Sequence, residues 1–477
     1  MEEYGYYVGG EFRKGKERIE VINPAAEEVF AYIFETNKKD LDFSIDKAVS
    51  AQREWREVNF KERARVLRGI SAVILDNLSR LAELETKEIG KPLKESLFVD
   101  IPLAAQCFDY YASFIESLEA KTFRTDTGID FIKYEPYGVC AVYIPYNVPL
   151  MIFGFSCAAA LAAGNSLIIK PSEFGSVSVL ELAKYIDKLN IPKGLINVVT
   201  GKGEETGKYL AKSKIDIISF TGSRNTLKKV VSSTKDTPKK IICELGGANL
   251  TVVFRDADKD AAIENILGSS FMKQGQMCIG TSIALIEDEI YDEFLKALLQ
   301  KTKNIETGDP FDAASGMGPL VTKGHLNSID THVKDVLKRG GRLLAGGEAI
   351  KRRGYFYTPT VIEIKDMIYD EFFAPVLMVK SFRESEIESL VENNPTGLVL
   401  QVWSKNLAKA QRLADIASCG TVWINTFAQM SPQTPFGGAK LSGWGRNLGS
   451  AGFFEYVQAK HIGIGLAKSP VEGWFGI

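Results

Sequence analysis

The sequence predicts an α/β protein that contains two doubly wound domains and a small additional β element. Strand-like and helix-like segments alternate over residues 139–243 and again over residues 251–424. Such alternation is typical of βαβ units, in which helices cover both faces of a parallel sheet. A chain of 477 residues is also too long for one ordinary core, so two or three domains are expected.

The segment before the first alternating run has a mixed pattern. Short strands and turns are expected over residues 6–33, and amphipathic helical patterns follow over residues 40–58 and 60–88. Another helix is expected after the glycine and proline that end the second pattern. Residues 123–134 then have the features of a small hairpin with a Thr-Gly turn.

Each alternating run supplies five expected strands. In the first run they cover residues 139–144, 166–170, 195–199, 215–220 and 239–243. In the second run they cover residues 251–254, 283–286, 376–382, 398–403 and 421–424. A last strand-like stretch, residues 456–466, stands alone and needs a partner, which is either the early hairpin or another subunit.

Composition limits the classes of function. Charged residues are 25% and hydrophobic residues 45% of the chain, as in soluble globular proteins. The formal net charge of -2 does not indicate a nucleic-acid partner, and no apolar run reaches the ~18 residues of a transmembrane helix. The acidic N-terminus lacks the features of a signal peptide, and the six cysteines are scattered, so a cytoplasmic protein is expected. Cysteines and histidines show no metal-ligand spacing, so no metal is expected.

One cysteine stands in a glycine-broken segment between a helical pattern and a strand pattern. Cys278 is preceded by Gly275 and followed by Gly280. A thiol on such a loop can be exposed and closely approached, as a nucleophile must be. The alternative is a buried cysteine that serves as a small hydrophobe, which is the commoner case for a lone cysteine.

Two residues at expected strand ends carry groups suited to catalysis. Asn147 lies between two prolines that fix the backbone, so its amide could donate to an oxyanion. Glu244 is followed by two glycines, so its carboxylate could act as a base with room for close approach. Taken alone, each is at least as well explained as an ordinary turn or linker residue.

Three motifs at strand ends are suited to a dinucleotide. Lys170 and Glu173 follow a strand at the edge where doubly wound sheets bind ligands, and they could contact ribose hydroxyls; a solvated helix cap is the alternative. Residues 201–207 are glycine-rich but have one residue too many for a dinucleotide fingerprint. Residues 220–223 precede a helix whose free backbone amides suit a phosphate.

In their order and separations, these motifs resemble those of the aldehyde dehydrogenase superfamily. The resemblance covers essentially the whole chain and includes the segments Gly275-Gln276-Met277-Cys278, Glu244-Leu245-Gly246-Gly247 and Glu371-Phe372-Phe373. It implies oxidation of an aldehyde to a carboxylic acid with NAD, or with NADP as the alternative. It also implies that Cys278 is the nucleophile, Asn147 the oxyanion donor and Glu244 the general base, with a thioacyl-enzyme intermediate.

The resemblance further implies which residues line the cofactor and aldehyde sites. The cofactor-binding set is Tyr146, Lys170, Ser172, Glu173, Gly203, Phe220, Gly222, Ser223, Leu245, Glu371 and Phe373. The aldehyde-tunnel set is Val148, Ile152, Phe155, Met277, Ile279, Ala428, Met430 and Phe436. All members of the tunnel set are apolar, so uncharged aldehydes are expected to be better substrates than acid semialdehydes. The sequence leaves open the direction of Lys273, the nearest basic residue in the cysteine loop.

The implied organisation has three parts. A cofactor domain takes residues 1–118 and 137–246, and a catalytic domain takes residues 247–443. Residues 119–136 and 456–477 form an oligomerisation hairpin and tail, so a homodimer or homotetramer is expected.

The sequence departs from the family pattern at several positions. Ser156 stands where a lysine is common, which puts a proton-relay role there in doubt, and Asn447 replaces the usual acidic residue. Leu227 and Ala374 each replace a usual glycine.

Several alternative functions follow from the same residues. Within the family they are a semialdehyde dehydrogenase, an enzyme for short polar aldehydes such as glyceraldehyde or lactaldehyde, and a CoA-acylating enzyme, which Glu244 disfavours. Outside it, a cysteine hydrolase would need a histidine partner for Cys278, and the chain has only three histidines, all distant in sequence. A non-catalytic protein on this fold is disfavoured by the presence of all three catalytic candidates.

Overall fold

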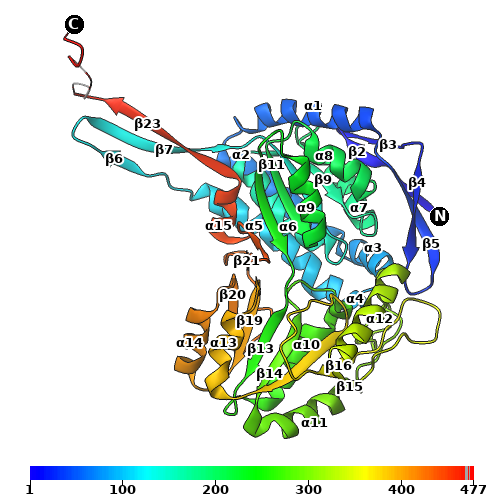
Figure 1. Ribbon diagram of the computed structural model, residues 1–477. Helices are drawn as coiled ribbons and strands as arrows, with labels where there is room; N and C mark the ends of the chain where they lie inside the picture. Colours follow the sequence, from blue (N-terminus) through cyan, green and yellow to red (C-terminus); the bar gives the residue numbers. More distant parts are fainter. Residues whose placement is uncertain (468–470, 472, 477) are drawn as a thin grey trace.

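The computed structural model of the protein describes residues 1–467, 471 and 473–476. Two sheets lie one above the other in Figure 1, and a thin β arm extends from the upper body. The upper body contains an eight-stranded sheet and the lower body a seven-stranded sheet.

Five parallel strands form the centre of the eight-stranded sheet. In sheet order they are β12 (Lys240–Leu245), β11 (Ile217–Gly222), β8 (Val139–Ile144), β9 (Ser166–Pro171) and β10 (Ile196–Val198). The antiparallel β22 (Gly443–Trp444) borders β12, and β2 (Tyr6–Val8) and β3 (Glu11–Arg13) complete the other edge. The central strands coincide closely with the first predicted run.

Helices cover both faces of this sheet because alternate strand residues point to opposite sides. Cys140, Val142 and Ile144 of β8 lie in one core, and Val139, Ala141 and Tyr143 lie in the other. The first core includes α2 (Phe60–Asp76), α3 (Leu78–Ile89), α5 (Ile101–Glu116), α6 (Pro149–Ala163) and α7 (Val177–Ile186). The second includes α1 (Lys38–Trp55), α8 (Lys208–Lys212) and α9 (Arg224–Ser233).

The seven-stranded sheet repeats this arrangement. Its parallel strands, in sheet order, are β16 (Thr360–Glu363), β17 (Val376–Phe382), β14 (Thr281–Glu287), β13 (Asn249–Val253), β19 (Val399–Trp403) and β20 (Thr421–Ile424), with β15 (Arg342–Ala345) antiparallel at one edge. One face packs on α12 (Lys323–Lys338), α13 (Ile387–Glu392) and α14 (Leu407–Ile416), and the other on α10 (Lys259–Phe271) and α11 (Tyr291–Thr302). Strands β15 and β16 were not predicted.

The helical region before the first sheet is more broken than its pattern predicts. The pattern over residues 60–88 is two helices, because Asn77 (φ -113°, ψ 17°) leaves the helical conformation between α2 and α3. The next helix begins as α4 (Leu93–Glu95) and a π-helical turn (Ser96–Asp100) before α5. These breaks bring Glu95 and Asp100 close to the loop that carries Cys278.

The arm is a three-stranded antiparallel sheet. β23 (Val457–Gly465) pairs with β7 (Gly128–Pro136) along its whole length, and β6 (Thr122–Arg124) lies on the other side of β7. The strand predicted near the C-terminus therefore pairs with the early hairpin of its own chain. β23 remains an edge strand of this sheet.

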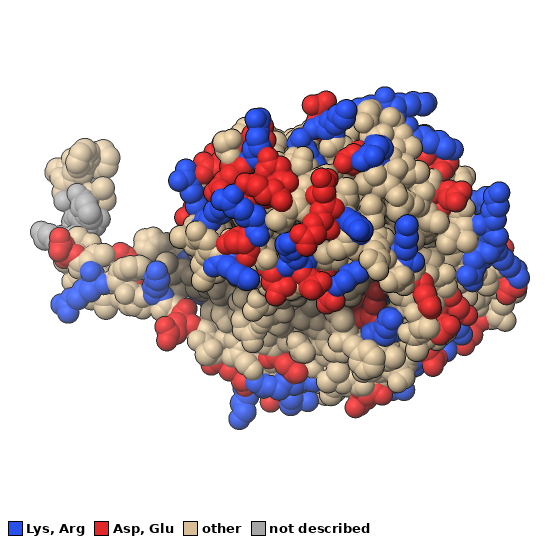
Figure 2. Space-filling model, turned by 90° about the horizontal axis from the view of Figure 1, so that it is seen from below, with Lys and Arg blue, Asp and Glu red and all other residues tan. Residues whose placement is uncertain are grey.

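The remaining short elements lie at the periphery. A small sheet contains β1 (Glu2–Tyr4), β5 (Glu28–Phe34) and β4 (Arg18–Asn23), and β18 (Thr396–Gly397) pairs with β21 (Ala439–Lys440). Helix α15 (Gly449–Glu455) precedes the arm strand β23. Acidic and basic side chains are interspersed over the face drawn in Figure 2. Within the described residues, no helix is long and apolar enough to cross a membrane.

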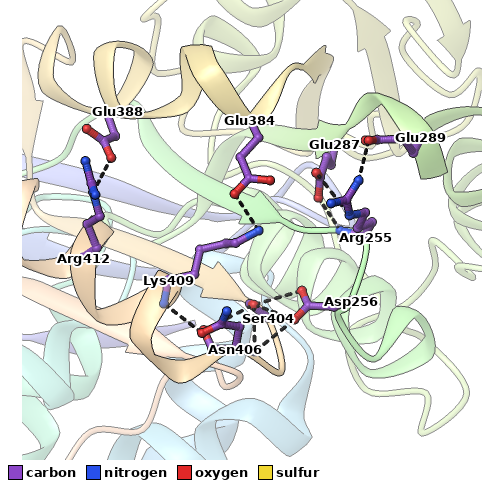
Figure 3. Close-up of polar contacts among 10 residues, drawn as sticks. All are labelled: Arg255, Asp256, Glu287, Glu289, Glu384, Glu388, Ser404, Asn406, Lys409 and Arg412. Carbon is purple, nitrogen blue, oxygen red and sulfur yellow. Dashed lines mark hydrogen bonds and ion pairs between the residues drawn. The ribbon is translucent and has the colours of Figure 1, made fainter.

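The two edges of the seven-stranded sheet differ. At its carboxyl edge, ion pairs join the strand ends and adjacent helices, for example Arg255 to Glu289 at 2.6 Å and Lys409 to Glu384 at 2.7 Å (Figure 3). The amino edge carries Cys278 before β14, and it meets the carboxyl edge of the other sheet through the Asn147 side chain. The candidate site lies at this second junction.

Candidate functional site

A cavity of about 1400 Å³ lies between the carboxyl edge of the eight-stranded sheet and the amino edge of the seven-stranded sheet. Asn147 reaches it from the end of β8, Glu244 from β12, and Cys278 from the loop before β14. The three catalytic candidates, which are distant in sequence, therefore line one cavity. Within the described residues, no cluster of three His, Cys, Asp or Glu side chains could hold a metal ion.

The Cys278 loop begins with a left-handed turn. Lys273 (φ 52°), Gln274 (φ 56°) and Gly275 (φ 66°) follow one another, and the two non-glycine residues each cost roughly 1–2 kcal/mol in this conformation. A Cβ on Gly275 would lie 2.1 Å from the carbonyl oxygen of Ala374, so only glycine permits this approach. The turn thus places the cysteine loop directly against the segment after Phe373.

The thiol of Cys278 is held in its neutral form. Burial raises its pKa to about 12, and the carboxylates of Glu371 and Glu244 add to the effect, while nearby backbone N–H groups oppose it. The carbonyl of Cys278 accepts a hydrogen bond of 2.7 Å from the Asn249 side chain, which fixes the backbone on the far side of the nucleophile candidate.

Asn147 is tied to the same loop. Its Nδ2 donates to the carbonyl of Gln276 at 2.8 Å, and the side chain is buried. An amide nitrogen has two hydrogens, so one remains for another acceptor. Because Pro149 starts α6 immediately afterwards, the position of Asn147 is fixed by regular elements on both sides.

Glu244 also lines the cavity, and only one of its two carboxyl oxygens is hydrogen-bonded among the described residues. Oε2 accepts a hydrogen bond from the N–H of Gly438 at 3.2 Å, whereas Oε1 has no hydrogen-bond partner among the described residues. Burial raises the pKa of this carboxyl well above its usual value, although the guanidinium of Arg446 opposes the shift. A Cβ on Gly437 would lie 2.5 Å from Oε1, so the neighbouring glycine leaves the carboxylate its space.

The cavity also carries groups suited to two riboses and a pyrophosphate. The ammonium of Lys170 is buried, has a pKa lowered mainly by burial, and lies 3.7 Å from the carboxylate of Glu173. Ser223 caps α9 by accepting a hydrogen bond from the N–H of Thr226 at 3.2 Å. Burial raises the pKa of Glu371 to about 7, against the opposing charge of Arg224.

A histidine that the sequence did not single out supports this part of the site. His325 lines the cavity, and its Nε2 lies 3.0 Å from the carbonyl oxygen of Phe373. A carbonyl only accepts, so Nε2 carries the hydrogen. This bond holds Phe373 at φ 53°, and the ring of Phe373 meets Tyr146 edge-on at 6.1 Å. Being isolated in sequence, His325 offered no motif by which to find it.

Most predicted site residues line the cavity. They are Tyr146, Asn147, Val148, Ile152, Phe155, Lys170, Ser172, Glu173, Gly203, Phe220, Gly222, Ser223, Glu244, Leu245, Cys278, Glu371, Phe373 and Phe436. Four of the predicted tunnel residues, Met277, Ile279, Ala428 and Met430, are not among its lining residues in the described part of the chain. Asn447 and Leu398 line it without having been predicted to do so.

Lys273 points away from the cavity. Its ammonium lies 3.2 Å from the buried carboxylate of Asp100. Ser156, at the position where a lysine was expected, is fully buried and lies 3.1 Å from the hydroxyl of Ser219.

Comparison with known proteins identifies the family. A model of the aldehyde dehydrogenase family matches residues 12–462. The chain belongs to the aldehyde dehydrogenase family. It is 36% identical to betaine aldehyde dehydrogenase of Bacillus subtilis, covering 98% of this chain and 99% of that one. It is 35% identical to the peroxisomal aminoaldehyde dehydrogenase 1 of Pisum sativum, covering 98% and 97%.

Solved structures of aldehyde dehydrogenases share the fold. Betaine aldehyde dehydrogenase from Staphylococcus aureus, in complex with NAD⁺, superposes with a TM-score of 0.95 at 33% identity and covers 99% of this chain and 97% of that chain. The NAD⁺ complex of an aldehyde dehydrogenase from Bacillus cereus gives a TM-score of 0.95 at 31% identity, with 97% of each chain covered. The predicted family and α/β fold class are confirmed, and the protein is an aldehyde dehydrogenase that oxidises an aldehyde.

Proposed function

We propose that Cys278, Asn147 and Glu244 carry out NAD-dependent oxidation of an aldehyde through a thioester on Cys278. The observation that supports this proposal is the convergence of a thiol, a buried amide and a buried carboxylate on one cavity. With purified enzyme, NADH absorbance should rise when an uncharged aldehyde and NAD are added. Cys278→Ala should abolish the rise while NAD binding is retained; more than a trace of turnover in this variant would refute the proposal.

The residues of the cavity fit NAD. Its volume, about 1400 Å³, exceeds the ~300–1,000 Å³ of a drug-sized pocket. Lys170 and Glu173 would hold one ribose, the first turn of α9 the pyrophosphate, and Glu371 the second ribose, with Phe373 beside the nicotinamide. The remaining implied contacts come from Tyr146, Ser172, Gly203, Phe220, Gly222, Ser223 and Leu245. When bound, NAD supplies the oxidising power by accepting a hydride from the substrate.

Acylation depends on the two donors near the thiol. When NAD is bound, its positively charged nicotinamide ring would lie beside Cys278 and Glu244 and would lower both raised pKa values, so that each group gives up its proton to solvent and the thiolate and the carboxylate form. The thiolate attacks the aldehyde carbon, and the oxyanion accepts hydrogen bonds from the free Nδ2–H of Asn147 and the N–H of Cys278. One such donor contributes about 3 kcal/mol to the transition state.

Deacylation depends on Glu244. After oxidation, the acyl group is a thioester on Cys278. The free Oε1 of Glu244 takes a proton from a water molecule, which attacks the thioester carbonyl. The C–S bond then breaks, the carboxylic acid leaves, and Cys278 is regenerated.

For the substrate, we propose uncharged or cationic aldehydes rather than anionic ones. The cavity lining includes Val148, Ile152 and Phe155, which belong to the apolar cluster against which Cys278 packs, and the ring of Phe155 meets Phe436 at 6.1 Å. Aromatic faces attract cations, and the named relatives act on betaine aldehyde and aminoaldehydes. Values of kcat/KM for butanal, betaine aldehyde and succinate semialdehyde test this order; a tenfold advantage for succinate semialdehyde would overturn it.

We also propose a preference for NAD over NADP, because the charge of Glu173 would repel a 2′-phosphate. The ratio of kcat/KM values for the two cofactors tests this, and a ratio that favours NADP would contradict it.

We propose a homodimer or homotetramer, because β23 is an edge strand of the arm sheet within the part of the chain that the structure describes. Light scattering at micromolar concentration should give two or four times the chain mass of 52.6 kDa, and the mass of a single chain would exclude the oligomer. All six cysteines are free, which supports the proposed reducing, cytoplasmic setting.

A further inference from the structure

A cluster of buried charges lies behind the Cys278 loop. It consists of Glu85 on α3, Lys91 after α3, Glu95 on α4, Asp100 in the π-helical turn, and Lys273 in the loop itself. All five side chains are buried, with exposed fractions from 0 to 6%. Buried charges are costly unless they are paired and hydrogen-bonded, so this arrangement is strongly constrained.

The pairing within the cluster is continuous. Lys91 forms ion pairs with both Glu85 and Asp100, and Asp100 also pairs with Lys273 at 3.2 Å. Although burial opposes ionisation, the ammonium groups of Lys273 and Lys91 keep the pKa of Asp100 below its usual value. Burial instead raises the pKa of Glu95, and the charge and backbone N–H of Lys273 oppose this shift.

The cluster contacts the two segments that carry the proposed oxyanion donors, through the N–H groups of Lys273 and Leu150. Both carboxyl oxygens of Glu95 lie 3.1 Å from the backbone nitrogen of Lys273, which is the first residue of the left-handed turn. On the other side, Oε2 of Glu85 accepts a hydrogen bond from the N–H of Leu150 at 3.1 Å, in the first turn of the helix that follows Asn147. The strained turn therefore has a specific acceptor for its first N–H and a buried anion for its ammonium.

We infer that Glu95 is a positioning residue for the nucleophile: through the backbone and ammonium of Lys273, it and Asp100 hold the left-handed turn that aims Cys278 toward Asn147. This inference rests on the proposed role of Cys278. Without an acceptor at position 95, the turn relaxes toward the ordinary backbone region, and the thiol leaves its alignment with the amide of Asn147. Acylation slows, while the cofactor groups on the eight-stranded sheet, Lys170 and Glu173, stay in place.

Three variants test the inference. Glu95→Ala removes the acceptor, whereas Glu95→Gln keeps a side chain of the same length whose amide oxygen can still accept a hydrogen bond from the N–H of Lys273. The control is Glu287→Ala. Like Glu95, Glu287 is a buried carboxyl with a raised pKa, and it accepts a hydrogen bond from a backbone N–H, that of Arg255, at 2.6 Å. Unlike Glu95, it lies at the end of strand β14 that is far from Cys278 (Figure 3).

The readouts are the rate constant of the NADH burst, the Kd for NAD and the Tm. Glu95→Ala should lower the burst rate at least tenfold with the Kd for NAD within twofold of wild type, and Glu95→Gln should stay within threefold on both measures. Glu287→Ala should lower Tm without lowering the burst rate. The inference would be overturned if Glu95→Ala kept the wild-type burst rate. It would also be overturned if Glu95→Gln or Glu287→Ala lost as much of the burst rate as Glu95→Ala does.

Two provisions keep the test decisive. If Glu95→Ala does not fold, Lys273→Met removes the ammonium but keeps the N–H; its burst rate should fall at least threefold at unchanged NAD affinity, and a wild-type burst would again overturn the inference. If the proposed function is wrong, the wild-type enzyme itself will give no NADH burst, or its burst will persist in Cys278→Ala.

Discussion

Gly246 offers a direct test of the cofactor side of the site. A Cβ built on Gly246 would lie 1.8 Å from Oε1 and 2.6 Å from Cδ of Glu371. To reach an ordinary contact distance of 3.4 Å, the carboxylate must move by about 1.6 Å. The three nearest atoms all belong to this one side chain, and Gly246 has no positive φ, so Gly246→Ala displaces Glu371 without straining its own backbone.

The expected loss follows from this displacement. A misplacement of about 1 Å in a positioning contact can cost about a hundredfold in rate, which corresponds to about 2.7 kcal/mol. We therefore expect kcat/KM for NAD to fall about a hundredfold in Gly246→Ala, by NADH absorbance at saturating aldehyde, with Tm close to wild type. Gly268→Ala is the matched control, because its nearest neighbour, the sulfur of Met272, is at an ordinary 3.6 Å.

A double-mutant cycle decides whether Glu371 carries the effect. If Gly246→Ala acts only by displacing this carboxylate, it should add little to Glu371→Ala, because the two changes share one cause. Full additivity, or wild-type kcat/KM in Gly246→Ala alone, would refute the reasoning.

Three further predictions concern the proposed chemistry. Glu244→Gln should retain the NADH burst but lower steady-state turnover about 10²–10⁴-fold, because only deacylation needs the base; loss of the burst with normal turnover would contradict this role. Asn147→Ala should lower the burst rate about 10²–10³-fold, and an unchanged burst would exclude it as an oxyanion donor. Because burial raises the pKa of Cys278 to about 12, alkylation of the free enzyme by iodoacetamide should rise about tenfold per pH unit from pH 7 to 9 and should speed up when NAD is added. A pH-independent rate, followed by peptide mass spectrometry, would show that the thiolate is already formed.

Strand ends explain why so much of the site could be predicted from the sequence. Asn147, Lys170 and Glu244 each follow an apolar run with strand character, and parallel strands bring their carboxyl ends to one edge. The strand pattern therefore predicts that these three residues lie close together. It missed the break at Asn77, because helical periodicity continues through a residue whose backbone is not helical.

Side-chain direction in loops could not be predicted in the same way. His325 acts through a backbone carbonyl far along the chain, and Met277, predicted to line the tunnel, is buried outside the cavity lining. Both outcomes depend on turns with positive φ, at Phe373 and in the cysteine loop. Such turns are stabilised by tertiary contacts, which periodicity does not encode.

The direction of Lys273 sets the expected discrimination among substrates. A substrate carboxylate in the cavity would need a cation, and Lys273 could serve only by breaking its ion pair with Asp100. Removing one partner of a buried ion pair costs about 3–5 kcal/mol, and 3 kcal/mol corresponds to more than about a hundredfold in kcat/KM. The enzyme can therefore accept an acid semialdehyde efficiently only if another cation reaches the acyl site, because recruiting Lys273 would also release the turn that positions Cys278.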